Sequence, residues 1–526
     1  MASSSTAQDG TTTATSTRVT LVNGQLHLDG FIYIRSRSGK SRVYWDCRKV
    51  RSGECKGRAV TTEPTEDEEV IVLRGPKDSP HTHPPNREEA AADVVMEKIK
   101  RKAELHPEQP PAQLLRTELA GVLAGVLSQL PDQPALAQTV RRTRRRHLPA
   151  NPTSLSALRE LPDRFKKTLL GENFLLYDSG ADQAIDESEQ DEDSHEETDK
   201  RNRVIVFGTR RNVELLCQSS TWFLDGTFKT APNIFVQIFT VLGLRSRAGR
   251  ADEQSAFPFV YALLPSKASE MYKEVLRSVR DAVAQFNVSQ CNPQRILTDF
   301  ELSIINACRE VYPQVLVTGC FFHLGQALYR RVQEEGLQVA YNDPDDRSLK
   351  LYTHMLLSLA FVPVTDVEIA FDELQATCPD EMRPVMEYFE KTYVRGKAAA
   401  RRGRSQRASI PPRYPPELWN QYNAAINKLH RSNNCSEGWH NRFRLVVGRD
   451  HPDLYSCIVE FQKEQSYTEA SLAELALGKR TKSVPKKQWA TLQHRIQDIV
   501  REYDAHKMAG TVLDYLRTLG YNVVLS

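Results

Sequence analysis

The sequence predicts an α/β (α+β) protein with a mixed β-sheet and flanking helices, preceded by a small β-rich module and helical segments. The chain has 526 residues, which is too long for one ordinary domain. From residue 204 onward, short apolar runs follow one another and then alternate with stretches of helical periodicity, which is typical of a mixed sheet covered by helices. Residues 21–84 instead contain short strand-like runs separated by turn residues.

The overall composition excludes several classes of protein. Hydrophobic residues make up 40% of the chain and charged residues 26%, so it can bury a sizeable core and is not collagen-like. No apolar run approaches the roughly 20 residues that span a bilayer, so we expect no membrane partner. The N-terminus lacks the basic-then-apolar order of a secretory signal. We therefore expect the nine cysteines to be thiols or metal ligands rather than disulfides.

Shifts in composition divide the chain into segments. The N-terminus is rich in Ser and Thr, and residues 178–199 contain eleven acids and few apolar residues, so neither stretch can bury a core. The predicted segments are a disordered N-terminus (1–20), the β-rich module (21–84), a helical, basic segment (85–170), an acidic linker (171–202), the mixed-sheet domain (203–450) with a helical insertion at about 325–430, and a C-terminal helical region (451–526).

The β-rich module contains four candidate metal ligands, namely Cys47, Cys55, His81 and His83. Two thiolates and two imidazoles can fill the tetrahedral shell of a structural Zn²⁺ ion. His81 and His83 are too close in sequence to share one helix face, so they suit an extended segment or a turn. A domain this small usually needs a metal or a similar cross-link, and the sequence therefore predicts a zinc site.

Two basic stretches are candidates for binding double-stranded DNA. Residues 35–58 carry nine Lys and Arg against two acids, and residues 141–146 form an Arg-rich run. Both can contact phosphates, although the second run can equally be a solvated helix end or a nuclear import signal. We expect the protein in the nucleus. The candidate DNA contacts are Arg42, Arg48, Lys49, Lys56, Arg58, Arg144, Arg145 and Arg146.

Three acidic residues form the second candidate site. Asp225 and Asp299 each follow an apolar, strand-like run, where a carboxylate is costly unless it is solvated, hydrogen-bonded or bound to a metal. Glu437 lies near the start of a predicted helix, on the same face as His440. Taken singly, each acid is more often a cap, turn or solvated residue. Together they can bind two Mg²⁺ or Mn²⁺ ions, which clamp the attacking and leaving oxygens in phosphoryl transfer.

The zinc module also contains a run of aromatic residues, Phe31, Tyr33, Tyr44 and Trp45. This run, with the order of the four candidate ligands, resembles the FLYWCH-type zinc finger. The resemblance implies zinc binding and DNA binding by about 60 residues of the chain. Which of its side chains read bases is left open.

The second half of the chain contains a series of ordered motifs: Asp225-Gly226-Thr227-Phe228, Ala231-Pro232, Phe257-Pro258, Tyr261 to Pro265, Thr298-Asp299-Phe300-Glu301, Cys320 to His323, Trp419-Asn420, Asn433-Asn434 and Glu437 to His440. With this series, residues 204 to about 455 resemble the transposase domain of Mutator-like elements (MULE). The resemblance implies an RNase H-like fold with a helical insertion before the last acid. It also implies a DDE-type active site made of Asp225, Asp299 and Glu437.

The Cys320 and His323 pair follows a strand-like run, and such a pair occurs in the family that this domain resembles. Two ligands do not make a zinc site. We therefore favour a structural role near the active site over metal ligation, for which Cys435 and His440 are the nearest conceivable partners. His440 is expected to contact the acids of the active site rather than the metal ions themselves.

We interpret the whole as a cut-and-paste DNA transposase that uses zinc-dependent DNA binding and two-metal cleavage and strand transfer. Terminal inverted repeats are the expected DNA target, and a homo-oligomer is the expected DNA-bound state. The basic loop at residues 394–416 either steers DNA or is simply solvated. Two alternatives remain open: a domesticated FLYWCH-type DNA-binding regulator of transcription or chromatin with an inactive core, and an RNase H-like nuclease.

Overall fold

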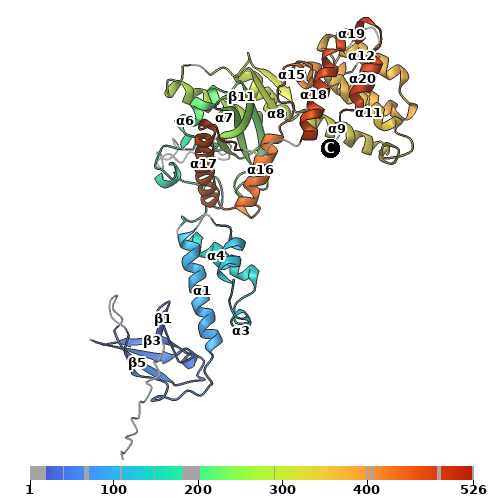
Figure 1. Ribbon diagram of the computed structural model, residues 1–526. Helices are drawn as coiled ribbons and strands as arrows, with labels where there is room; N and C mark the ends of the chain where they lie inside the picture. The colour runs from blue at the N-terminus through green and yellow to red at the C-terminus, as the bar shows by residue number, and fades with distance from the viewer. Residues whose placement is uncertain are drawn as a thin grey trace, which may run out of the picture. The chain divides into compact units, whose positions relative to one another are not determined.

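The computed structural model describes residues 19–39, 41–63, 70–106, 109–146, 148–180, 202–289, 291–397, 401–402, 405–406, 409–481 and 487–523. The chain forms two compact units, residues 1–149 and residues 150–526 (Figure 1). Residues 1–18 and 181–201, on which most of the predicted disordered N-terminus and acidic linker fall, lie outside the described residues.

The first unit begins with a six-stranded antiparallel sheet in which every strand pairs with the next one along the chain. Asn23-Gly24 and Asp29-Gly30 adopt positive φ between the first strands, as two-residue hairpin turns require. The predicted β-rich module is thereby confirmed. Its strands are β1 (Val19–Val22), β2 (Gln25–Leu28), β3 (Phe31–Ser38), β4 (Arg42–Cys47), β5 (Arg58–Thr62) and β6 (Val72–Arg74).

A helical subdomain completes the first unit. Its first helix begins at Asn86, whose side chain accepts a hydrogen bond from the backbone of Glu89. Ile99, Leu114 and Val140 form its small apolar core. The helices are α1 (Arg87–Leu105), α2 (Pro111–Glu118), α3 (Ala124–Leu127) and α4 (Gln133–Arg145). The predicted helical segment was too long, because residues 150–170 contain no α-helix and belong to the second unit.

The second unit is built on a seven-stranded mixed sheet with the order β13-β12-β9-β10-β11-β8-β7. Strands β9, β10 and β11 are antiparallel neighbours, whereas β12 and β13 run parallel to β9. The mixed sheet predicted from the sequence is thereby confirmed. Its strands are β7 (Leu175–Asp178), β8 (Ile205–Phe207), β9 (Thr221–Thr227), β10 (Gln237–Arg247), β11 (Arg250–Leu264), β12 (Arg295–Thr298) and β13 (Leu316–Gly319).

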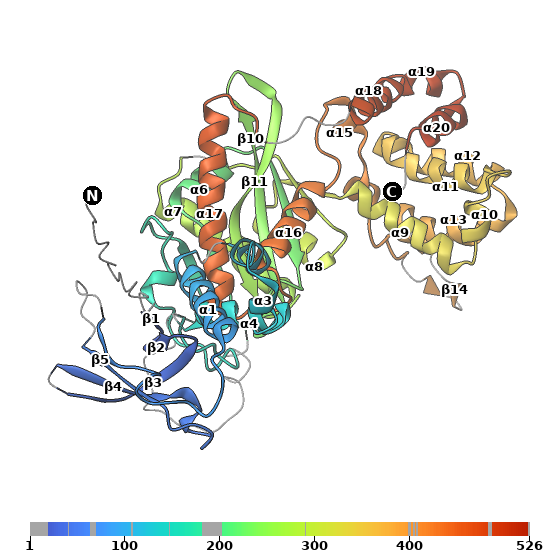
Figure 2. The same ribbon diagram turned by 60° about the horizontal axis from the view of Figure 1, so that its bottom comes forward.

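Helices cover both faces of this sheet (Figures 1 and 2). Trp222 and Leu224 of β9 pack into the apolar core on one face. Because successive side chains of a strand point to opposite faces, Phe223 and Asp225 face the other side, where Asp225 meets helix α16. The helices of the first face are α6 (Arg210–Cys217), α7 (Ser269–Gln285) and α8 (Leu302–Val311), and those of the second are α16 (Asn434–Val447) and α17 (Leu454–Ala476).

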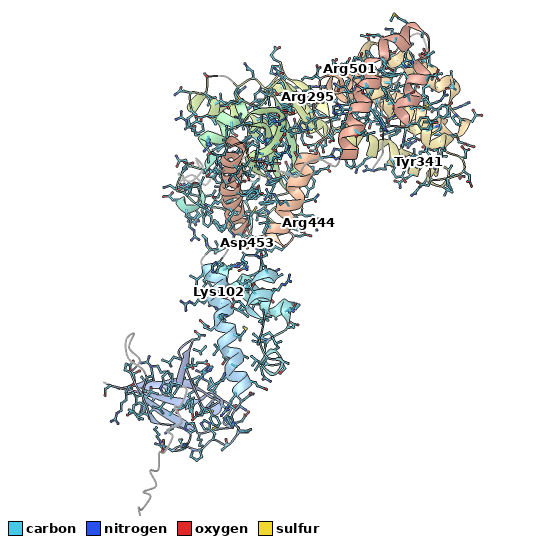
Figure 3. All side chains as sticks on the ribbon, in the orientation of Figure 1. Lys102, Arg295, Tyr341, Arg444, Asp453 and Arg501 are labelled. Carbon is cyan, nitrogen blue, oxygen red and sulfur yellow. A yellow bond between two sulfur atoms is a disulfide. The ribbon has the colours of Figure 1, made fainter. Side chains whose placement is uncertain are left out.

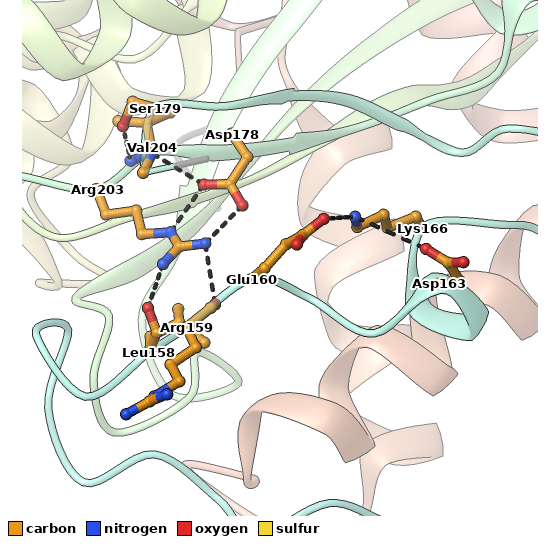
Figure 4. A network of polar contacts seen from close by, with 10 residues as sticks. Leu158, Arg159, Glu160, Asp163, Lys166, Asp178, Ser179, Arg203 and Val204 are labelled. Carbon is orange, nitrogen blue, oxygen red and sulfur yellow. Dashed lines mark hydrogen bonds and ion pairs between the residues drawn. The ribbon is translucent and has the colours of Figure 1, made fainter. Parts of the chain in front are cut away.

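The edge strand β7 corrects the predicted start of the acidic linker. Asp178, the first of the eleven acids in residues 178–199, forms a buried ion pair with Arg203, with an Oδ2–Nη2 distance of 2.7 Å. The Arg203 guanidinium also donates to the carbonyls of Leu158 and Arg159 (Figure 4). The linker prediction was therefore wrong for residues 171–180. The run of acids reveals charge, but it does not reveal that the first acid has a partner across the edge of the sheet.

A disulfide corrects the prediction for two of the cysteines. Cys217 at the end of α6 and Cys291 after α7 are bonded, with their Cα atoms 4.3 Å apart. The pairing arises because α6 and α7 pack together on the same face of the sheet, which sequence spacing does not reveal. The predicted zinc ligands Cys47 and Cys55 are both thiols.

A separate helical body stands at the side of the sheet (Figure 2). The predicted insertion supplies α9 (Phe321–Glu334), α10 (Gln338–Tyr341), α11 (Ser348–Ser358), α12 (Val367–Thr377), α13 (Arg383–Phe389), α14 (Pro416–Trp419) and α15 (Tyr422–Ile426). The C-terminal helices α18 (Lys487–Arg501), α19 (Tyr503–Met508) and α20 (Val512–Gly520) pack into the same body.

The C-terminal region therefore has two separate structural roles. Helix α17 covers the sheet, whereas α18 to α20 complete the helical body, where Ile496 and Tyr503 are buried. No helix among the residues given above is both long and apolar enough to cross a bilayer.

Candidate zinc module and candidate active site

The four predicted zinc ligands meet beside the first sheet. Cys47 ends β4, Cys55 precedes β5, and His81 and His83 lie in the bend that leads to α1. Cys47 Sγ lies 3.2 Å from His83 Nε2, and Cys55 Sγ lies 3.3 Å from His81 Nδ1. All four ligand atoms are within 4.8 Å of one another. These distances fit one Zn²⁺ ion at bond lengths of about 2.0–2.3 Å.

Neighbouring groups orient both imidazoles. His81 Nε2 is 2.8 Å from the Tyr33 hydroxyl, and His83 Nδ1 is 3.0 Å from the carbonyl of Pro84. These contacts leave Nδ1 of His81 and Nε2 of His83 free to bind the metal. In zinc sites, the ring nitrogen that does not bind the metal usually makes such a hydrogen bond, which fixes the orientation of the ring. The ring of Phe31 stacks on His81 with the centroids 3.9 Å apart.

The protonation of the ligands couples metal binding to pH. Burial raises the pKa of the Cys47 thiol to about 11 and lowers the pKa of His81. Burial also acts to raise the pKa of Cys55, but hydrogen bonds from Gly57 and Thr82 outweigh it and lower that pKa. Zinc binding must therefore release a proton from Cys47, whereas His81 already favours the neutral form that ligates metal.

The candidate DNA contacts of the zinc module differ in how far they are neutralised. Arg48 and Arg58 have carboxylate partners at 2.9 and 3.2 Å, and Lys49 has one at 3.8 Å. Arg42 and Lys56 are exposed and form no ion pair with any other described residue. The exposed pairs contribute little stability, so these cations can exchange a carboxylate for a phosphate.

The three arginines predicted at the end of α4 do not share one role. Arg144 donates to three main-chain carbonyls between residues 103 and 109, at 2.7–3.1 Å, and so closes α4 onto the end of α1. Its role is structural, which corrects its prediction as a DNA contact. Arg145 and Arg146 are exposed and stay predicted contacts.

In the second unit, Asp225 and Asp299 lie side by side at the end of two parallel strands. Leu297 of β12 pairs with Phe223 of β9. Asp299 lies two residues after Leu297, and Asp225 lies two residues after Phe223, so the two aspartates occupy equivalent positions. Burial raises the pKa of Asp299, and the nearby charge of Asp225 raises it further. The edge of the sheet therefore holds two carboxylates whose charges repel and which a cation would stabilise.

Helix α16 brings the third acid to this edge. Glu437 Oε1 lies 3.4 Å from His323 Nε2, and His440 Nδ1 lies 3.3 Å from Asp225 Oδ2. The three-residue spacing of Glu437 and His440 places both side chains toward the sheet. The register of β10 puts Thr240 opposite Asp225, and its hydroxyl contacts His440 Nε2 at 3.3 Å.

Two contacts that the sequence did not predict hold α16 in place. Asn433 donates from Nδ2 to the carbonyl of Leu224, the residue before Asp225, at 3.1 Å. Trp439 is buried and donates from Nε1 to Glu464 of α17 at 2.8 Å. Asn433 stands at the N-cap of α16, and no local pattern indicates that its side chain reaches β9.

The Cys320 and His323 pair connects the acids to the helical body. Cys320 is buried at the start of α9, and its Sγ accepts the backbone N–H of Asn433 at 3.2 Å. Burial alone would lower the pKa of His323, but Cys320 and the charges of Asp299 and Glu437 raise it to about 9. His323 is therefore a cation that faces two of the three acids.

The donors at this edge are of the kind that hard divalent cations such as Mg²⁺ or Mn²⁺ prefer, because Asp225 and Asp299 are neighbouring carboxylates and Glu437 lies beside His323. The acids do not form a closed ligand cluster. Within the described ranges, only the zinc module brings three or more Cys, His, Asp or Glu ligand atoms together closely enough to hold an ion. At this edge, the imidazoles of His323 and His440 lie beside the carboxylates of Glu437 and Asp225.

A groove of about 710 Å³ adjoins Asp299. Asp299, Glu301 and His323 line its acidic end. The basic loop at residues 394–416 also lines the groove, through Lys397 and Arg413, and Arg330 of α9 and Lys391 add two more cations. The groove thus joins an acidic catalytic edge to a basic surface that suits a phosphate backbone.

Comparison with known proteins identifies two domains. The MULE transposase domain matches residues 221–327, and the FLYWCH zinc finger domain matches residues 16–83. The chain therefore carries a FLYWCH zinc finger followed by a MULE transposase domain, as predicted. The first match includes Asp225, Asp299, Cys320 and His323, but Glu437 lies beyond it. No curated protein matches the chain.

Proposed function

We propose that this protein is a DNA transposase that binds double-stranded DNA through its zinc module and cleaves and rejoins DNA at Asp225, Asp299 and Glu437. The observation that carries the proposal is the equivalent position of Asp225 and Asp299 on the paired strands β9 and β12, with α16 bringing Glu437 toward them. Terminal inverted repeats are the proposed target, and a homo-oligomer in the nucleus is the proposed working form.

Each side chain has a specific role in this proposal. Two Mg²⁺ or Mn²⁺ ions, when bound by the three carboxylates, would supply Lewis-acid stabilisation of the attacking and leaving oxygens. Asp225 is oriented by the imidazole of His440, which Thr240 in turn contacts. His323 offsets the negative charge of Asp299 and Glu437, and the cations of the groove bind the phosphates on either side.

The test uses the full-length, zinc-loaded protein and labelled duplex DNA with candidate element ends. We expect Mg²⁺- or Mn²⁺-dependent cleavage and strand transfer, reduced roughly a hundredfold or more in Asp225→Asn because a charged ligand is lost. Asp252→Asn is the matched control, since Asp252 is an exposed acid on the β11 hairpin. Equal activity of Asp225→Asn and the wild type would contradict the catalytic assignment.

The same assay distinguishes the two alternative functions. Zinc-dependent DNA binding without cleavage under any metal condition indicates a DNA-binding regulator with an inactive core. Cleavage that needs no specific end and prefers an RNA–DNA hybrid indicates an RNase H-like nuclease. Sedimentation of the DNA complex measures whether the protein assembles on its target.

A further inference from the structure

The helical body contains a cavity of about 1010 Å³ that the proposed active site does not use. Helix α9 forms one of its walls. Its residues Phe322, Tyr329 and Gln333 face the cavity, whereas His323 faces the groove at Asp299. Gln326 and Arg330 line both spaces, because they lie between these two faces of the helix. The cavity and the active-site groove are therefore neighbours on adjacent faces of α9.

The cavity has an unusual charge. None of the described residues that line it is Asp or Glu. The lining does include four basic residues, namely Arg330, Lys350, Lys428 and Arg431. Aromatic side chains lie among them: Phe322 and Tyr329 are half-buried, whereas Tyr341, labelled in Figure 3, is buried. Cations beside accessible aromatic rings are the combination that binds the phosphates and bases of unpaired nucleic acid.

Two guanidinium groups near the cavity have no ion-pair partner among the described residues. Arg431 lines the cavity, and its Nη1 is buried without a hydrogen-bond partner there. Arg295, labelled in Figure 3, lies near Arg431 and donates to Thr318, Gln421 and the carbonyl of His430, all of which are neutral. Burial lowers the pKa of both arginines to about 10. A bound anion would offset this uncompensated charge.

The backbone at Lys428 provides an independent indication. Lys428 follows α15 and has a φ of 54°, a left-handed conformation that usually selects Gly or Asn after a helix. A lysine at this position is strained, because in the left-handed conformation its Cβ crowds the following carbonyl oxygen. Backbone outliers of this kind are typical of functional sites, and here the lysine lines the cavity.

We propose that this cavity binds phosphorylated nucleotide units, with Lys350, Lys428 and Arg431 contacting the phosphates and the aromatic rings contacting the bases. The proposal rests on the proposed function for its source of ligand: an unpaired part of the DNA strand whose phosphodiester lies at Asp299. That strand would pass over Gln326 and Arg330 from the groove into the cavity. A free mononucleotide presents the same chemistry, and the experiment distinguishes the two sources.

The test measures binding of a fluorescent single-stranded oligodeoxynucleotide to the full-length protein. Excess unlabelled duplex occupies the zinc module, and Mg²⁺ and Mn²⁺ are omitted, so the result does not depend on catalysis. The variant Lys350→Gln/Lys428→Asn removes two exposed cations, and Asn suits the left-handed backbone, so the fold is expected to persist. Lys479→Asn, an exposed lysine after α17, is the matched control.

We expect the double variant to bind the single strand roughly tenfold more weakly, with a salt dependence shallower by about 1.4 in log–log slope, or about 0.7 for each lost phosphate contact. Lys479→Asn should match the wild type. An unchanged affinity and slope in the double variant, or an equal loss in Lys479→Asn, overturns the proposal.

The source of the ligand is read from competition with deoxyadenosine monophosphate. Tighter binding of the oligonucleotide than of the mononucleotide supports the strand, and equal binding supports the free nucleotide. Asp225→Asn should retain single-strand binding even though it lacks cleavage, so failure of the catalytic proposal is distinguishable from failure of this one. Ultraviolet crosslinking of a thymidine-containing oligonucleotide only to residues outside the cavity would also overturn the assignment.

Discussion

Gly57→Ala tests the geometry of the zinc module without removing any ligand. A Cβ on Gly57 would lie 2.5 Å from the His81 ring, and ordinary contact begins at 3.4 Å, so the ring would have to move by about 0.9 Å. Zinc–ligand distances tolerate only about 0.2 Å. The stacked ring of Phe31 and the hydrogen bond to Tyr33 oppose such a movement. His81 is therefore expected to lose its place in the coordination shell.

The size of the effect follows from the four-ligand site. Structural zinc sites gain about 10–16 kcal/mol from their ligands, so losing one of four should cost about 3 kcal/mol. That corresponds to roughly a hundredfold in zinc affinity. Competition with a chromophoric chelator measures the affinity, and excess zinc should restore DNA binding. Gly39→Ala is the control, because its Cβ would meet its nearest neighbour at 3.6 Å. Wild-type zinc affinity in Gly57→Ala would refute His81 as a ligand.

Two further substitutions test how the second unit is held together. Burial acts to raise the pKa of Asp366, but hydrogen bonds from Lys507 and Tyr503 outweigh it and lower this pKa below 3.8. The ionised carboxylate therefore stabilises the folded protein at neutral pH, and this contribution is lost as the pH falls through the folded-state pKa. Asp366→Asn should lower the free energy of unfolding by about 2 kcal/mol at pH 7, and the difference from the wild type should shrink in acid. Urea titrations at several pH values measure this difference, and a difference that stays constant across pH would contradict the reasoning. Arg203→Leu should cost about 3–5 kcal/mol because Asp178 is left buried and unpaired; a change below 1 kcal/mol in thermal unfolding would argue against the buried ion pair.

The zinc ligands and the strand-end aspartates could be predicted because their signals are local. Cys47, Cys55, His81 and His83 are ligand-type residues within a short stretch, and hairpin turns need only nearby residues to bring them together. Asp225 follows the apolar residues that identify its strand, and the corresponding ends of parallel strands lie at the same edge of a sheet.

Contacts between distant segments could not be predicted in the same way. Asn433 stands at the N-cap of α16, yet its side chain donates to the carbonyl of Leu224 on β9 rather than capping the helix. Arg144 belongs to a basic run that indicates DNA contact, yet its guanidinium donates to the main chain of its own unit. In both cases the residue type is consistent with several partners, and only packing selects one.

The sequence by itself determined the chemistry of this protein: a set of thiolates and imidazoles for zinc, three carboxylates for hard cations, and basic stretches for phosphate. Residue type and short-range periodicity carry that information without any knowledge of the chain's path. The tertiary structure alone decided which charges are balanced. It paired Asp178 with Arg203, set His440 against Asp225, and left Arg431, beside an open cavity, with no carboxylate partner among the described residues. Such pairings depend on strand register and helix packing, which bring together side chains that are far apart in the sequence.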